Sequence, residues 1–116
     1  MTLLFHQEAV RVRAGTRTDR AGNTIPDWSP EAVDRLTLTR LNIAPRTTEE
    51  NRDESGVRVT TGWWLQTAPG ADADIASADR IEFDGLLCEV VGDVARWPDP
   101  FTGKVHHVKV ALQRAT

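Results

Sequence analysis

The chain has 116 residues, 40% of them hydrophobic and 27% charged, which allows one domain around a modest core and is ordinary for a globular protein. Its formal net charge of -3 excludes the basic footprint of a tight nucleic-acid binder, although not contact with DNA that is guided past. One cysteine excludes an internal disulfide, and no stretch approaches the ~20 apolar residues of a membrane-spanning helix.

The first residues carry no targeting signal that we can recognise. Residues 1–8 show neither a basic start nor an apolar run of signal-peptide length, so we expect a protein that is made and used inside a cell. We expect residues 1–116 to form a single domain, with residues 1–6 as a flexible N-terminal tail.

The first third of the chain predicts strands joined by polar turns. Residues 7–14 alternate between valine on one face and arginine on the other, as a half-buried strand does. The polar residues 15–23 predict a turn with Ala-Gly-Asn at its tip, and residues 24–28 return as a short strand that its proline confines to an edge. Ser-Pro at the start of residues 29–35 favours one helical turn.

Two strands and two long loops are expected in the middle of the chain. Residues 36–43 form a strand whose shifted alternation, between Leu38 and Leu41, indicates a bulge, and Ala-Pro closes it. The very polar residues 46–56 predict a long exposed loop. Residues 57–66 form the next strand, in which Gly62 marks a second bulge or a close approach of the backbone. The small, acidic residues 68–78 have loop composition.

The last third predicts a strand meander. Residues 80–83 and 86–91 alternate around Asp84-Gly85, and Asp-Gly between such runs is the strongest short hairpin signal in a sequence. Gly92-Asp93 ends the second strand, and residues 97–103, Trp-Pro-Asp-Pro-Phe-Thr-Gly, form a loop too rich in aromatic residues and proline to be a plain connector.

These elements predict an all-β protein, a small antiparallel β-barrel of six to seven strands with two long loops. A barrel hides the strand edges that an open sheet of this size exposes. The residues expected to be buried are Val10, Val12, Leu38, Val59, Ile81, Phe83, Val90, Val108, Val110 and Leu112.

Nothing in the sequence has the pattern of a catalytic or metal site. Adjacent residues of a strand point to opposite faces, so His106 and His107 should not chelate one ion. Cys88 shares a face with apolar neighbours and is expected to be a buried hydrophobe, because a reactive thiol needs an open, cationic setting. We therefore expect no catalytic residue, no metal and no cofactor.

The tryptophans are the strongest candidates for contacts. Trp63 and Trp64 are adjacent in a strand, so one ring should point inward and the other outward, and Trp97 lies in a loop. Exposed tryptophan is a common interface anchor. Equally, the outward rings could be covered by the long loops of the same chain.

Four ordered segments resemble the head-completion proteins of long-tailed bacteriophages, also called head-to-tail stoppers or head-closure proteins. The segments are residues 42–50 (NIAPRTTEE), 59–70 (VTTGWWLQTAPG), 78–93 (ADRIEFDGLLCEVVGD) and 98–110 (PDPFTGKVHHVKV). Together they cover about the last two-thirds of the chain, and their order and spacing carry the resemblance.

The resemblance implies a non-enzymatic β-barrel protein of the virion neck, assembled in the host cytoplasm. Such a protein forms a dodecameric ring, or a hexameric one as the alternative, below the portal and head–tail adaptor and above the tail terminator and tail tube. It joins the filled head to the tail and retains the packaged double-stranded DNA that passes through its channel. We expect no membrane partner.

The residues that we expect at these contacts lie in the two long loops and among the aromatic residues. Candidates for an interface between subunits or neighbouring rings are Arg46, Glu49, Glu50, Arg52, Asp53, Glu54, Trp64, Trp97 and Phe101. Candidates for the channel surface are Asp72 and Asp74, because the second loop carries acids without a basic residue before Arg80.

Two other functions remain open on the sequence alone. One is an OB-like barrel that binds single-stranded nucleic acid by stacking bases on Trp63 or Trp64 and Trp97, although a basic groove is missing. The other is a small hydrolase, and the scattered histidines are the only sequence feature that favours it.

Overall fold

The computed structural model describes residues 4–50 and 57–115, with the side chains of residues 4–46 and 62–115. This part of the chain contains strands and turns and no helix, and hence no helix that could cross a membrane. The strands are β1 (Gln7–Arg13), β2 (Gly15–Thr18), β3 (Thr24–Asp27), β4 (Asp34–Glu50), β5 (Val57–Thr67), β6 (Arg80–Phe83), β7 (Leu86–Pro98) and β8 (Val105–Arg114).

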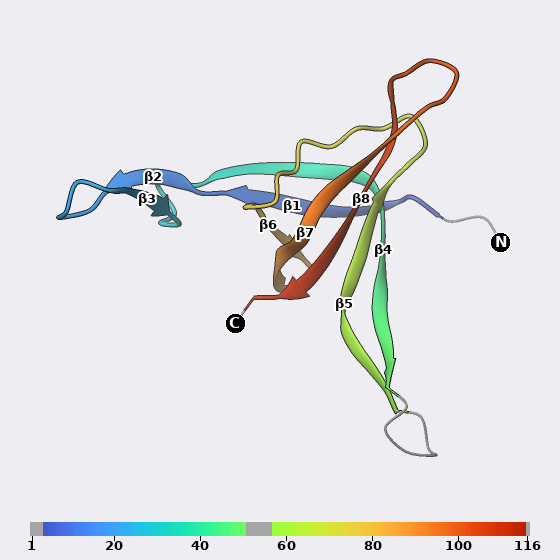
Figure 1. The fold of residues 1–116 in the computed structure, drawn as a ribbon, viewed down its shortest axis with the longest axis horizontal. Helices are drawn as coiled ribbons and strands as arrows, with labels where there is room; N and C mark the ends of the chain where they lie inside the picture. The colour runs from blue at the N-terminus through green and yellow to red at the C-terminus, as the bar shows by residue number, and fades with distance from the viewer. Residues whose placement is uncertain (1–3, 51–56, 116) are drawn as a thin grey trace.

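Six of the strands close into an antiparallel barrel in the order β1-β4-β5-β8-β7-β6, and β2 and β3 form a separate two-stranded sheet (Figure 1). The predicted fold class, a small all-β antiparallel barrel, is confirmed. The Asp84-Gly85 hairpin is also confirmed, since Phe83 pairs with Leu86 across a two-residue turn in which both residues have positive φ.

Alternation along the strands predicts most of the core, but the predicted faces are reversed in β1, where Ala9 and not Val10 or Val12 belongs to the core cluster. Most of the expected core is buried, namely Val12, Leu38, Ile81, Phe83, Val108, Val110 and Leu112. Val10 and Val90 are only half-buried, and the side chain of Val59 lies outside the described residues. Ala73 and Ile75, from the loop between β5 and β6, also pack into the core.

Strand β4 is longer than predicted and bends. Its first half pairs with β1 and its second half with β5, and the change falls at Arg40, which has a φ of 56°. The bulge expected between Leu38 and Leu41 is therefore confirmed. The expected end of the strand at Ala-Pro is wrong, and residues 46–50 are strand and not loop, because their backbone pairs with β5 without needing apolar side chains.

Strand β7 also continues past its expected end. Its pairing with β8 shifts between Val91 and Ala95, which marks a bulge at the predicted stop, and then resumes as far as Pro98. The prediction that Gly92-Asp93 ends the strand is therefore wrong, because a bulge accommodates these two residues inside a longer hairpin.

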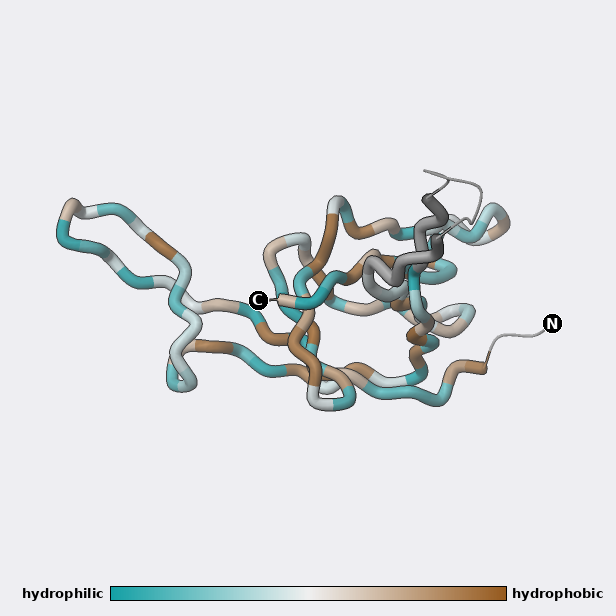
Figure 2. The backbone as a smooth tube through the Cα atoms, turned by 90° about the horizontal axis from the view of Figure 1, so that it is seen from below, coloured by the Kyte–Doolittle hydropathy of each residue, from teal (hydrophilic) through white to brown (hydrophobic). Residues whose placement is uncertain are grey.

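Three hairpins project from the barrel, and we call them the β2–β3, β4–β5 and β7–β8 arms. They point in three different directions in the plane of Figure 1, and the molecule measures 53 × 45 × 25 Å. Figure 2 shows hydrophobic residues concentrated in the barrel, while the β2–β3 arm is mostly hydrophilic. The short strand 24–28 and its turn were predicted, but not that they stand apart from the barrel. The helical turn favoured after Ser29 forms, since Val33 donates a hydrogen bond to the carbonyl of Ser29.

Candidate functional site

Two exposed tryptophans flank a shallow groove on the outer face of β5, β8 and β7. Trp64 is 39% exposed and Trp97 is 53% exposed. The groove has a volume of about 340 Å³, and the ammonium of Lys109 lies 4.6 Å from the Trp64 ring centre. Trp63 points the other way and packs edge-to-face on Phe83 at 5.5 Å. One tryptophan of the adjacent pair is thus inward and one outward, as predicted.

The adjacent histidines do not lie on opposite faces. Their Nδ1 atoms are 2.9 Å apart, and the ring of His107 stacks on Trp97 at 5.7 Å. The reason is a bulge, since Trp97 pairs with His107 but Pro98 pairs with Val105, which leaves His106 as an extra residue. Burial, then His106 and Lys109, lower the pKa of His107. Within the described residues no group of three potential ligands could hold a metal ion.

Phe101 lies at the tip of the β7–β8 arm and is 96% exposed. The turn beneath it is well ordered, because the carboxylate of Asp99 accepts hydrogen bonds from the backbone N–H groups of Phe101 and Thr102. The backbone of Asp99 also pairs with Lys104 and Gly103. A large apolar side chain held in water by an ordered turn is a natural contact point for another protein.

Arg46 does not project from an exposed loop as predicted. It is half-buried in β4, where its guanidinium donates to the carbonyl of Leu112 at 3.3 Å and lies 5.7 Å from the Trp64 ring centre. It therefore ties β4 to β8 inside the molecule. The side chains of the other candidates from this segment, Glu49, Glu50, Arg52, Asp53 and Glu54, lie outside the described residues.

The loop between β5 and β6 is fastened to the barrel by arginines. Arg13 contacts the buried carboxylate of Asp79 at 2.9 Å and also Asp74, and the hydrogen bonds from Arg13 lower the pKa of Asp74. Arg96 donates to two carbonyls of the loop and lies 3.6 Å from Asp72. The loop is acidic in sequence, but in the fold arginines from β1 and β7 compensate its carboxylates.

Sequence reasoning missed these arginines. Arg11 was expected on the outer face of β1, and this is wrong: it pairs with the core residue Ile81 of β6 and therefore points to the inner face, where it is 2% exposed. It binds the carboxylates of Asp34 and Asp74. The alternating arginines of β1 and the three spaced aspartates of the loop were visible in the sequence, but their pairing depends on the barrel closing β1 onto β6.

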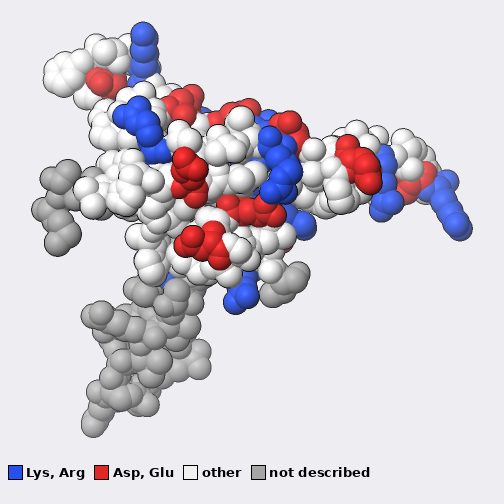
Figure 3. Space-filling model, turned by 180° about the vertical axis from the view of Figure 1, so that it is seen from behind, with Lys and Arg blue, Asp and Glu red and all other residues white. Residues whose placement is uncertain are grey.

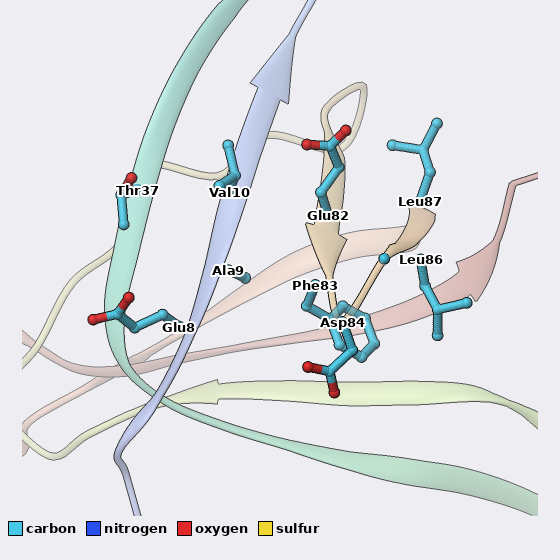
Figure 4. A pocket seen from close by; sticks show the side chains of 10 residues that line it. Glu8, Ala9, Val10, Thr37, Glu82, Phe83, Asp84, Leu86 and Leu87 are labelled. Atoms are coloured by element: carbon cyan, nitrogen blue, oxygen red, sulfur yellow. The ribbon is translucent and has the colours of Figure 1, made fainter.

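A second hollow, of about 520 Å³, lies where β1 and β6 separate (Figure 4). Their pairing ends at Val10 and Glu82, so the strands diverge beyond that point. Carboxylates of Glu8, Glu82 and Asp84 surround the hollow, and its apolar lining comes from Ala9, Val10, Phe83, Leu86 and Leu87. Sequence reasoning did not find this hollow.

The cysteine Cys88 is buried in the barrel as predicted, and burial raises the pKa of its thiol.

The described residues thus form a small antiparallel barrel with projecting hairpins, exposed aromatic residues and an acid-rimmed hollow. No protein-family model matches the sequence, and no curated protein does. A chain of the virion of a native gene transfer agent (GTA) particle has a similar structure, with a TM-score of 0.50 and 18% sequence identity over 96% of each chain. At this identity the likeness shows that the two chains share a fold.

Proposed function

We propose that this chain is a structural protein of a phage-like virion and that it forms a ring in the head–tail connector. The observation that carries the proposal is the shared fold, which extends over 96% of both this chain and a chain of a gene transfer agent virion. The four sequence segments that resemble head-completion proteins support the connector in particular.

The shape of the molecule supports a position between neighbours on several sides. Three arms leave the barrel in different directions, and the β7–β8 arm ends in the exposed Phe101. In a ring, one direction serves contacts between subunits and the others serve the rings above and below. We propose a dodecamer, with a hexamer as the alternative, between the portal and adaptor on one side and the tail on the other.

In this role the protein acts by contact and not by catalysis. It closes the filled head, joins it to the tail and lets the double-stranded DNA pass during ejection. The arms and exposed aromatic residues are the groups that such contacts need.

The proposal is tested by deleting the chain from the particle-producing system. We expect DNA-filled heads and free tails to accumulate, and we expect the tagged protein to be found at the neck of complete particles by electron microscopy. Replacing Phe101 with serine should weaken joining, while Thr102→Ser in the same turn should not. A protein that is absent from purified particles, or joining that proceeds without it, would contradict the proposal.

A second candidate is a barrel that binds single-stranded nucleic acid. The groove between Trp64 and Trp97, with Lys109 beside it, is the observation that favours it, because bases stack on exposed aromatic rings. Titration of tryptophan fluorescence with single-stranded DNA tests it. Quenching that saturates at physiological salt, and that is lost in Trp97→Ala, would favour this function over the connector.

A further inference from the structure

We propose that the β2–β3 arm of one copy docks into the hollow between β1 and β6 of a second copy. This inference rests on the proposed ring and names the contact between its subunits. The arm and the hollow are both strand edges without a partner in the described part of the chain, and their charges are complementary.

The arm is a two-stranded sheet, and neither of its outer edges pairs with another strand among the described residues. A two-stranded sheet of this kind is marginally stable on its own, and free edges tend to pair with other chains. Its turn is nevertheless ordered, because the carboxylate of Asp19 accepts hydrogen bonds from the backbone N–H groups of Ala21 and Asn23. Its root is anchored by Arg80, whose guanidinium lies 4.0 Å from the ring centre of Trp28.

The end of the arm carries cationic groups that are available to a partner. Arg17 and Arg20 are exposed, and neither takes part in an ion pair with the described residues. Figure 3 shows Lys or Arg at the outer end of this projection and acidic groups on the body of the barrel. The nearby acids Asp19 and Asp27 accept backbone hydrogen bonds in turns. Hydrogen bonds from Ser29, and then the charge of Arg17, lower the pKa of Asp27, so of these two acids only Asp27 is close enough to Arg17 to respond to its charge. The donors of both exposed guanidinium groups therefore remain available to acceptors of a partner.

The hollow supplies such acceptors. Glu8 and Asp84 are exposed on its rim and form no ion pair with described residues, whereas Glu82 is paired with Arg35. The edge of β1 at Glu8 and Ala9 faces the hollow without a strand partner, because pairing with β6 begins only at Val10. An arriving hairpin therefore finds a free backbone edge, apolar side chains and two unpaired carboxylates.

The occupant is a second copy because the arm of the same chain points away. The hollow lies at the start of β1, and the arm begins directly after β1 ends, so β1 itself separates them (Figure 1). Contact between two different surfaces of identical chains is head-to-tail, and such contacts generate closed rings when the rotation closes. The arm and hollow thus provide the asymmetry that a ring requires.

Charge reversal tests the contact in the full-length protein. An arm variant, R17E with R20E, and a hollow variant, E8R with D84N, should each weaken self-association about tenfold in sedimentation at low salt, because exposed ion pairs are exchanged for repulsion. Asparagine at position 84 tolerates the positive φ there. An equimolar mixture of the two variants should regain association, since each arm then meets a complementary hollow. If neither the arm variant nor the hollow variant, each tested by itself, associates more weakly than the wild type, the proposal is overturned.

Disulfide trapping gives a measurement that does not depend on the strength of association. A chain with A21C at the tip of the arm and T37C in the hollow should form a ladder of linked oligomers under mild oxidation. A21C alone should give at most dimers, and the wild-type chain should give none because Cys88 is buried. A double variant that yields no ladder beyond dimers would overturn the contact.

The results separate this inference from the proposed function. If the purified protein forms the ladder but the protein itself is not found in particles, the contact is supported and the connector role is contradicted. Protein that is present at the neck, but whose particles show no link between positions 21 and 37, would support the connector and overturn the contact.

Discussion

Gly62 is the residue at which the barrel leaves least room for a side chain. A Cβ atom there would lie 1.8 Å from the carbonyl oxygen of Leu112, and the φ of 156° is one that other residues rarely adopt. We expect Gly62→Ala to reduce the free energy of unfolding by about 3 kcal/mol, as measured by urea denaturation. Gly22→Ala, where nothing lies within 4 Å, is the matched control and should cost about 1 kcal/mol. Equal losses would contradict the close approach.

The histidine pair predicts a pH dependence of stability. Because the pKa of His107 in the fold lies below its ordinary value of 6.5, the unfolded chain binds more protons than the folded one as the pH falls below that value. The stabilisation by neutral His107 is complete above pH 6.5 and is lost as the pH falls through the folded pKa. We expect the urea midpoint to fall over this window in the wild type and to fall less in His107→Phe. His6→Gln, at an exposed position, should retain the wild-type profile.

At the scale of elements, the loop between β5 and β6 depends on Arg13. Arg13→Gln leaves the carboxylate of Asp79, which is 1% exposed, without its cationic partner, and we expect a loss of about 1–3 kcal/mol. Hydrogen exchange should rise in residues 71–78 and not in β8. Arg17→Gln, which removes an exposed arginine of the arm, should change neither. Unchanged exchange in the loop of Arg13→Gln would show that Arg11, Arg96 and the apolar packing of Ala73 and Ile75 hold the loop without Arg13.

Changes in the segment between β4 and β5 should affect head–tail joining without affecting the stability of the fold. Glu50 pairs with Val57 through the backbone, so Asn-Gly in place of residues 51–56 can close the hairpin. We expect this replacement to leave the thermal midpoint unchanged and to impair head–tail joining, because Arg52, Asp53 and Glu54 offer both signs of charge for contacts. Replacing the three by alanine at constant length is the companion variant. If both variants join heads to tails as well as the wild type does, residues 51–56 only link β4 to β5 and make no contact needed for joining.

The sequence predicts the strands well where alternation is regular and poorly where a bulge interrupts it. The hairpin at Asp84-Gly85 was predicted because two residues determine its turn. The extensions of β4 past Pro45 and of β7 past Gly92 were missed, because pairing in them comes from backbone groups, which leave no hydrophobic pattern. The contact between His106 and His107 was also missed, because the bulge that places both rings on one side arises from a register shift in the pairing of β7 with β8.

The candidate contact residues were predicted in part. The sequence left open whether the outward tryptophans are exposed or covered by loops, and Trp64, Trp97 and Phe101 are exposed. Trp97 was expected in a loop, but it lies in β7, where it pairs with β8. The hollow around Glu8 and Asp84 was not expected, because it forms where two strands distant in sequence stop pairing. Such a site follows from barrel closure, which composition and periodicity along one strand do not reveal.

At the scale of the whole molecule, we expect weak binding to double-stranded DNA at physiological salt. The net charge is -3, and arginines compensate the acidic loop without leaving it basic. Neutral to acidic surfaces bind few phosphates and release few counterions. In the proposed connector role, retention of DNA would then come from physical closure. Fluorescence anisotropy with a labelled duplex tests this, and tight binding that is lost only at high salt would contradict it.

The arms and the barrel carry different constraints, which bears on how such proteins diverge. The core of the barrel tolerates few substitutions, whereas the outer parts of the arms contribute little to it. A chain of a gene transfer agent virion has this fold over 96% of its length at 18% identity, so very different sequences are compatible with the same architecture. We therefore expect mutations to accumulate fastest in the arms, and new specificities to arise by the exchange of one hairpin between lineages while the barrel is inherited intact.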